Sequence, residues 1–192
     1  LIGTDVLPAK VSSFGGTNIL RPERAPAERC SVCPSDIKDG CLLRAPEGPS
    51  VHSVDGHDGS DLYPGDLCAW TADKDIVDNQ TVMIEYRNGI RVQFSVNMFA
   101  HKGDRTITII GDKGRLSGSL AKGEMELIGS SDGDRTIIET ASKDGSHGGG
   151  DARLVEDFVN IVLGKEPNRA DSSAGYLATL LAEKSDQSMR EG

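Results

Sequence analysis

The sequence predicts an α+β fold: an open, mostly antiparallel β-sheet with helices packed on one face. Three observations support this fold class. One central segment alternates strictly between apolar and polar residues, several strand-like segments are joined by short turns, and two helical segments follow only after the strands. Strands followed by segregated helices are typical of α+β architecture, whereas a nucleotide-binding domain alternates strands and helices regularly.

The alternating segment is Ile90–Met98, around which the predicted sheet of Asp78–Leu120 is organised. Its period of two is the pattern of a strand with one dry face. We expect the polar row to be either hydrated or in contact with another subunit or domain. The apolar residues are Ile90, Val92, Phe94, Val96 and Met98, and the polar row is Arg91, Gln93, Ser95 and Asn97.

Short turns connect this strand to its neighbours. Asn88-Gly89 separates it from a preceding strand at Thr81–Tyr86, and Asn-Gly tolerates positive φ at both turn positions of a hairpin. On the other side, the residues of Gly111–Gly114 are predicted to turn the chain between strands at Arg105–Ile110 and Arg115–Leu120.

Before the sheet, Ala9–Gly15 is a predicted short strand, and residues 17–67 form a long irregular insertion. Such loops in compact domains are usually functional or mobile. Within and after it, we predict one helical turn at Asp61–Leu67 and a short strand at Cys68–Thr71. The insertion's prolines are Pro22, Pro26, Pro34, Pro46, Pro49 and Pro64.

After the sheet, two more strands are predicted at Glu124–Ile128 and Arg135–Glu139. Asp151 is a suitable cap for a helix that runs to Leu163 and stops at Gly164. A final helix is predicted from Asp171 or Ser172. The apolar stripe of the first helix comprises Leu154, Phe158 and Val162, widened by Val155 and Val159.

Composition restricts the possible partners. The chain has 192 residues, a net charge of −9 and a pI near 4.9, so we expect no nucleic-acid or membrane partner. No stretch has the apolar length of a bilayer span. We therefore expect a cytoplasmic protein. Because the chain starts at Leu1, we also expect it to be a piece of a longer protein.

Four cysteines are present, at Cys30, Cys33, Cys41 and Cys68. The Cys30-x-x-Cys33 pair with Cys41 nearby is compatible with a metal or a redox disulfide. A second C-x-x-C pair is absent and Cys68 is distant in sequence. We therefore expect plain reduced thiols and assign no metal ligand.

The most distinctive candidate for a binding site is His147-Gly148-Gly149-Gly150-Asp151. Glycines allow a ligand to approach the backbone closely, and a following helix N-terminus favours anions or sugar hydroxyls. The alternative is a flexible linker with a surface histidine. A second polar group, His52, Asp55, His57 and Asp58, is more consistent with a solvated loop than with a metal site.

Four segments follow one another along the chain in a recognisable order and spacing: Val77–Val82, Glu85–Gly89, Gly111–Leu116 and His147–Asp151. Together they resemble the C-terminal domain of the glucose–fructose oxidoreductase / inositol dehydrogenase / MocA (Gfo/Idh/MocA) family. Val11–Gly16 resembles the first strand of that domain, and Cys30–Ala45 resembles a cysteine-containing insertion of some members.

The resemblance implies a dihydrodipicolinate-reductase-like C-terminal domain that forms half of a two-domain enzyme. Members bind NAD or NADP mainly through an N-terminal Rossmann domain and transfer hydride to or from a sugar, cyclitol or related polyol. On this basis residues 1–192 form a single substrate-binding and oligomerisation domain, and the Rossmann domain is absent from this chain. A homo-oligomer through the sheet face is expected.

Two catalytic segments of the family, a Glu-Lys-Pro segment and an Asp-x-x-x-His motif, have no match in this chain. We therefore assign no catalytic residue here, expect the segment alone to be inactive, and leave any cofactor-binding residue open. Only His147, Gly148, Gly149, Gly150 and Asp151 are carried over, as a substrate-binding loop. The alternatives are an NAD-dependent glycosidase of the same family and a stand-alone binding or assembly module.

Overall fold

A computed structural model describes residues 2–41, 43–44, 67–71, 74–100, 103–140, 149–168 and 170–192. The chain divides into two compact units. The first unit comprises Leu1–His101 with Ser172–Gly192, and the second comprises Lys102–Asp171. Both units combine antiparallel strands with a helix, which confirms the predicted α+β class.

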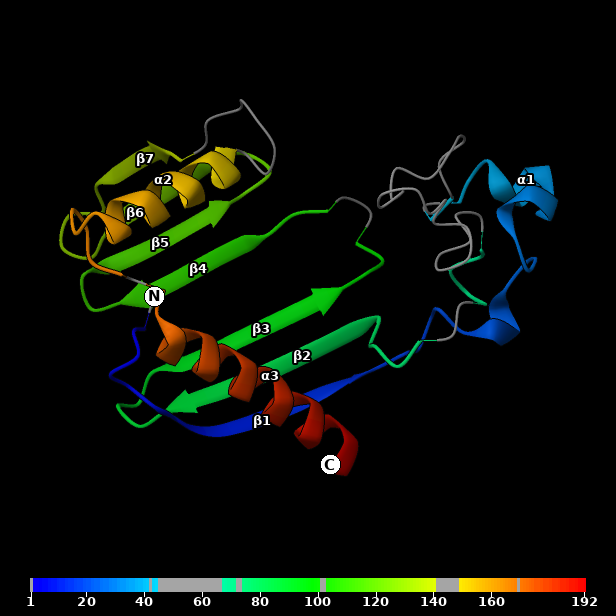
Figure 1. The fold of residues 1–192 in the computed structure, drawn as a ribbon, viewed down its shortest axis with the longest axis horizontal. Helices are drawn as coiled ribbons and strands as arrows, with labels where there is room; N and C mark the ends of the chain where they lie inside the picture. Colours follow the sequence, from blue (N-terminus) through cyan, green and yellow to red (C-terminus); the bar gives the residue numbers. More distant parts are fainter. Residues whose placement is uncertain are drawn as a thin grey trace. The chain divides into compact units, whose positions relative to one another are not determined.

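The first unit contains a three-stranded antiparallel sheet in the order β1-β2-β3 (Figure 1). Its strands are β1 (Pro8–Gly16), β2 (Asn79–Tyr86) and β3 (Arg91–Asn97). All three agree with the predicted strands to within two residues at each end. The described residues between β1 and β2 include the short helices η1 (Pro22–Arg24), η2 (Cys30–Val32) and α1 (Ser35–Lys38).

The hairpin between β2 and β3 is looser than the Asn88-Gly89 turn predicted. Tyr86 N donates to Ile90 O at 2.8 Å, so the connection has the three residues Arg87–Gly89. The last residue of this connection, Gly89, has a positive φ of 87°. Three-residue hairpins commonly end in such a left-handed residue, which explains the glycine.

Helix α3 (Ser172–Glu191) covers one face of this sheet (Figure 1). Its start agrees with the predicted Asp171 or Ser172. The core on this face includes Val82 of β2, which is buried, and Ser185 of α3. Ser188 Oγ accepts a hydrogen bond from the backbone N–H of Ser13 at 3.1 Å, which ties the helix directly to β1.

The second unit contains a four-stranded antiparallel meander in the order β4-β5-β6-β7. Each strand corresponds to a predicted one, and the helix follows the strands as expected. The elements are β4 (Thr106–Gly111), β5 (Gly114–Ser119), β6 (Glu124–Gly129), β7 (Arg135–Glu139) and α2 (Gly150–Val162).

Two local predictions need correction. Cys68–Thr71 is not a strand: only Leu67 pairs, in an isolated bridge with Arg29, and the chain then turns, with Thr71 N donating to Cys68 O. In addition, the strands predicted as one run between Asp78 and Leu120 are divided between the two sheets. The helical turn predicted at Asp61–Leu67 lies outside the described residues except for Leu67.

None of the helices within the described ranges is both long enough and apolar enough to cross a membrane.

Candidate functional site

The N-terminus of α2 is the described part of the predicted binding loop. Gly149 is the N-cap residue, with a left-handed backbone (φ 79°), and no side chain caps the helix there. The prediction that Asp151 is the cap is wrong, because the helix already begins at Gly150 and Asp151 lies in its first turn. There its negative charge interacts favourably with the helix dipole.

The structure therefore places Gly149, Gly150 and Asp151 together at one helix end, whereas His147 and Gly148 lie outside the described residues. The first N–H groups of a helix have no intrahelical partner and point out of its N-terminus. An N-cap without a side chain also gives a ligand close access to the backbone. This end of α2 is chemically suited to an anion or a hydroxyl oxygen.

The apolar stripe predicted for α2 is present but remains exposed. Leu154 is 71% exposed and Phe158 67%, and Val162 is equally open. The helix ends at Val162, and Gly164 follows with φ 68°, close to the predicted end. The stripe thus follows the helical period expected from the sequence without forming a buried core.

A groove of about 490 Å³ lies beside α3 in the first unit. Val82, Ile84 and Phe94 form its apolar sheet side. At its polar end Arg190 Nε and Asp186 Oδ2 form an ion pair at 2.8 Å. A second groove of about 400 Å³ lies along β1, between Pro8–Val11 and the C-terminal half of α3. Neither groove could be inferred from the sequence, because each combines residues that are far apart in the chain.

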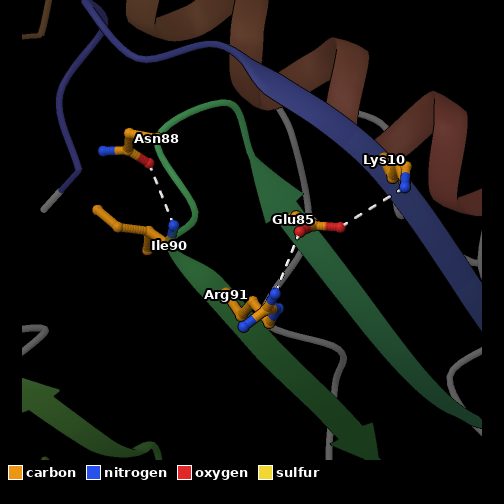
Figure 2. Close-up of polar contacts among 5 residues, drawn as sticks. All are labelled: Lys10, Glu85, Asn88, Ile90 and Arg91. Atoms are coloured by element: carbon orange, nitrogen blue, oxygen red, sulfur yellow. Dashed lines mark hydrogen bonds and ion pairs between the residues drawn. The ribbon is translucent and has the colours of Figure 1, made fainter.

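The face of β1–β3 opposite α3 is polar and open. Glu85 lies between two cations, with its carboxylate 3.8 Å from Lys10 Nζ and 3.3 Å from Arg91 Nη2 (Figure 2). Thr81 and Ser95 share a hydrogen bond between their hydroxyls on the same face. These groups include Arg91 and Ser95 of the predicted polar row of β3. Exposed pairs of this kind contribute little to stability.

Asp78 is a strongly perturbed carboxylate that sequence reasoning did not single out. The side chain is only 2% exposed. Burial by itself would raise its pKa, but hydrogen bonds to the charged form lower the pKa to about 2. Its carboxylate accepts hydrogen bonds from the backbone N–H groups of Asn18, Ile19 and Leu20 and from the Asn79 amide.

Asp78 therefore fixes the chain that leaves β1 to the start of β2. Its own backbone completes the link, since Asp78 N donates to Gly16 O and Met98 N donates to Asp78 O. All of its acceptor capacity faces protein donors. We assign Asp78 a structural role rather than a chemical one.

No group of three or more His, Cys, Asp or Glu side chains in the described ranges is arranged to hold a metal ion. The four cysteines are free thiols in this structure. The group formed by His52, Asp55, His57 and Asp58 lies outside the described residues.

A family model described as "Oxidoreductase family, C-terminal alpha/beta domain" (GFO_IDH_MocA_C) matches residues 42–192. The chain belongs to this family. The resemblance seen in the sequence, and the fold class that it implies, are therefore confirmed.

One curated relative of this Gfo/Idh/MocA domain is "Putative oxidoreductase YteT" of Bacillus subtilis (strain 168). It is 28% identical over 197 residues, which cover 88% of this chain and 45% of that protein. The chain therefore spans less than half the length of this relative.

Solved structures show the same fold. UDP-N-acetylglucosamine 3-dehydrogenase GnnA from Acidithiobacillus ferrooxidans matches with a TM-score of 0.59 and 12% identity, over 96% of this chain and 41% of that one. A levoglucosan dehydrogenase in complex with NADH and levoglucosan matches with a TM-score of 0.55 and 16% identity, over 63% and 38%. An oxidoreductase domain protein from Kribbella flavida matches with a TM-score of 0.52 and 16% identity, over 95% and 44%.

The residues of this Gfo/Idh/MocA domain do not by themselves fit a dinucleotide. Its sequence has no G-x-G-x-x-G between a strand and a helix, which is the element that holds a pyrophosphate in nicotinamide-binding domains. The strands of both described sheets are antiparallel and lack the parallel crossover of such a domain.

Proposed function

We propose that this chain is the substrate-binding and oligomerisation domain of an NAD(P)-dependent oxidoreductase. The whole enzyme would transfer hydride between the nicotinamide and a carbinol carbon of a sugar, cyclitol or similar polyol. The observation that carries the proposal is the family match over residues 42–192. Two solved structures of the same fold are named as sugar dehydrogenases, and one of them contains NADH, which supports the substrate class and the cofactor.

In this proposal the cofactor is NAD or NADP, bound mainly by a Rossmann domain outside this chain. That assignment agrees with the lack of a dinucleotide fingerprint here and with the chain's span of less than half of its curated relative. Hydride leaves the carbinol carbon for the nicotinamide, and the hydroxyl proton passes to a base that is also outside this chain. We therefore assign no catalytic residue to residues 1–192.

The role of this chain in the reaction is to bind and orient substrate. We assign His147, Gly148, Gly149, Gly150 and Asp151 to the substrate side of the site. The exposed N–H groups at the start of α2 suit polyol oxygens, and the left-handed Gly149 keeps them accessible. An imidazole at position 147 would add a hydrogen bond whose strength changes near neutral pH.

The test is steady-state kinetics of the full-length protein on a panel of sugars and polyols with NAD⁺ or NADP⁺. We expect turnover, followed by the absorbance of the reduced nicotinamide, on at least one polyol. In the His147→Ala variant we expect KM for that substrate to rise about tenfold, the effect of losing one polar contact worth about 1.4 kcal/mol. His57→Ala, in the long insertion, is the matched control and should leave KM unchanged.

Two results would contradict parts of this proposal. No nicotinamide reduction with any polyol, combined with cleavage of a nitrophenyl glycoside that requires NAD⁺, would identify the glycosidase branch instead. An unchanged KM in His147→Ala across all accepted substrates would remove the role given to the 147–151 loop and leave the enzyme class intact.

We also propose that the open face of β1–β3 forms a homo-oligomer interface. Two large apolar side chains stand on this otherwise polar face, Phe14 at 72% exposure and Met83 at 59%. The same face carries the Lys10–Glu85–Arg91 group (Figure 2). It also carries the Thr81–Ser95 pair. Apolar residues in the middle of a polar surround are the usual composition of a subunit interface.

Localisation in the cytoplasm remains a prediction from the sequence.

A further inference from the structure

The four cysteines of the first unit come from three separate segments of the insertion region. Cys30 and Cys33 lie at the two ends of the single turn η2, where Cys33 N donates to Cys30 O at 3.3 Å. Such a turn places the two side chains of a C-x-x-C pair where both can bind one ion. Cys41 follows α1, and its N–H donates to Lys38 O at 3.2 Å.

Cys68 is distant in sequence but is brought to the same region by backbone pairing. Leu67 forms an antiparallel bridge with Arg29, and Cys68 N donates to Glu28 O at 3.0 Å. Thr71 Oγ1 also donates to Glu28 O, at 3.2 Å. The residue before Cys68 therefore pairs with the residue before Cys30. Cys68 itself is only 6% exposed.

The thiols are close enough to interact electrostatically. The pKa of the Cys33 thiol is raised from its ordinary value, first by burial and then by the neighbouring thiols of Cys68, Cys30 and Cys41. Lys38 acts in the opposite direction and favours the Cys33 thiolate. These interactions agree with the backbone contacts, which bring Cys68 to the segment that carries Cys30 and Cys33.

The described part of this region buries little apolar surface. None of the described residues between positions 21 and 44 is buried, and η1, η2 and α1 have no buried residue. A segment that cannot bury apolar surface needs another source of stability, and in small folds that source is often a disulfide or a structural metal. The four thiols are the groups here that can supply it.

We propose that Cys30, Cys33, Cys41 and Cys68 form a tetrathiolate zinc site that fixes the insertion to the chain entering β2. A structural zinc ion takes four thiolate ligands in a tetrahedron, and one C-x-x-C pair with two further cysteines meets that requirement. In this structure the four thiols are not arranged to hold a metal ion. Binding would draw them inward and release the thiol protons, so that metal binding and the folding of this segment are coupled.

This inference changes the sequence-based expectation of plain thiols, which depended on the distance of Cys68 along the chain. It also stands apart from the proposed oxidoreductase function, because a structural zinc ion takes no part in hydride transfer. Disulfide bonding is the alternative use of these thiols, and the four cysteines are free thiols in this structure. A reducing cytoplasm would also disfavour the disulfide.

The test is metal analysis of the full-length protein, purified without a metal-affinity tag and under reducing conditions. We expect about one zinc ion per chain and a first shell of four sulfurs at about 2.3 Å by X-ray absorption. Cobalt substitution should give the thiolate-to-metal absorption of a tetrahedral site. These measurements on the unaltered protein do not depend on how any variant folds.

Variants then assign the ligands. Cys68→Ser should lose its zinc to a competing chelator at least tenfold more readily than the unaltered protein, and Cys30→Ser with Cys33→Ser should hold none. Val32→Ala, inside the same C-x-x-C turn, keeps all four sulfurs and should retain zinc. Three results would overturn the proposal: no zinc in protein that also takes up none when it is added, equal zinc in the double variant, or alkylation that finds any two of the cysteines joined in a disulfide.

Discussion

Replacing Asp78 by asparagine should destabilise the first unit more than any other conservative carboxylate change in its described residues. The carboxylate accepts four hydrogen bonds, two on each oxygen, at 2.7 to 3.1 Å. An amide turns one acceptor oxygen into a donor, so that two of these bonds are lost and donors face donors. At about 1.5 to 3 kcal/mol for each bond to a charged group, we expect a loss of about 3 to 6 kcal/mol.

The assay is urea unfolding followed by the fluorescence of Trp70, the only tryptophan in the chain. Trp70 lies in the first unit and packs edge-on against Phe99, with ring centroids 6.1 Å apart, so its emission reports on that unit. Asp75→Asn is the matched control, because Asp75 is an exposed carboxylate in the same segment. We expect the control to lie within about 0.5 kcal/mol of the unaltered protein.

The same contact predicts how stability depends on pH. The folded pKa of about 2 lies below the ordinary value of 3.8, so the charged form stabilises the fold above pH 3.8 and this contribution is lost as pH falls toward 2. The contribution is about 2 kcal/mol. The acid loss should therefore be smaller in Asp78→Asn. A variant within about 0.5 kcal/mol of the unaltered protein, with a parallel pH profile, would refute the assigned role of Asp78.

Three further changes test other parts of the structure. Gly114→Ala should destabilise the second unit by about 2 to 4 kcal/mol, because Gly114 has φ 143° and an added Cβ would clash with the backbone oxygen of Ile128 in β6. Gly133→Ala, with φ 70° and open space, should cost only about 1 kcal/mol, and equal protection of the β5 amides in both variants would contradict this. Met83→Glu should shift the full-length protein to a smaller assembly in light scattering, since it places a charge at the centre of the proposed interface, and an unchanged mass would exclude that face. Ser188→Ala removes the hydroxyl that accepts from the Ser13 N–H, and faster hydrogen exchange of the Ser13 amide, by about fivefold for a loss near 1 kcal/mol, is expected; unchanged exchange would show that α3 does not depend on this bond.

Local patterns were sufficient for most of the secondary structure. The alternation in Ile90–Met98 and the β-branched run before Gly111 correspond to β3 and β4, because a period of two has few alternatives in a sheet with one dry face. The helix stripe of Leu154, Phe158 and Val162 likewise appears in α2. The predicted start of α2 was wrong. Asp151 is a residue type that often caps helices, but the N-cap residue of α2 is Gly149.

The failures share a different cause. Cys68–Thr71 has strand-like residues, but a strand needs a partner, and only Leu67 found one. The grooves beside α3 could not be foreseen, because each is formed by side chains that lie far apart in sequence.

The sequence by itself determined the α+β class, the order of strands and helices, the family, and the loop that we assign to substrate, since all of these depend on local pattern and on motif order. Only the tertiary structure decided that Asp78 is a buried anchor and that the backbone of Cys68 is bonded to the segment that precedes Cys30. The physical reason is that each of these depends on a contact between distant segments. Asp78 Oδ2 accepts a hydrogen bond from the N–H of Leu20, and the N–H of Cys68 donates to Glu28 O. Such contacts form only when the chain closes a long loop, and their partners leave no periodic trace in the sequence.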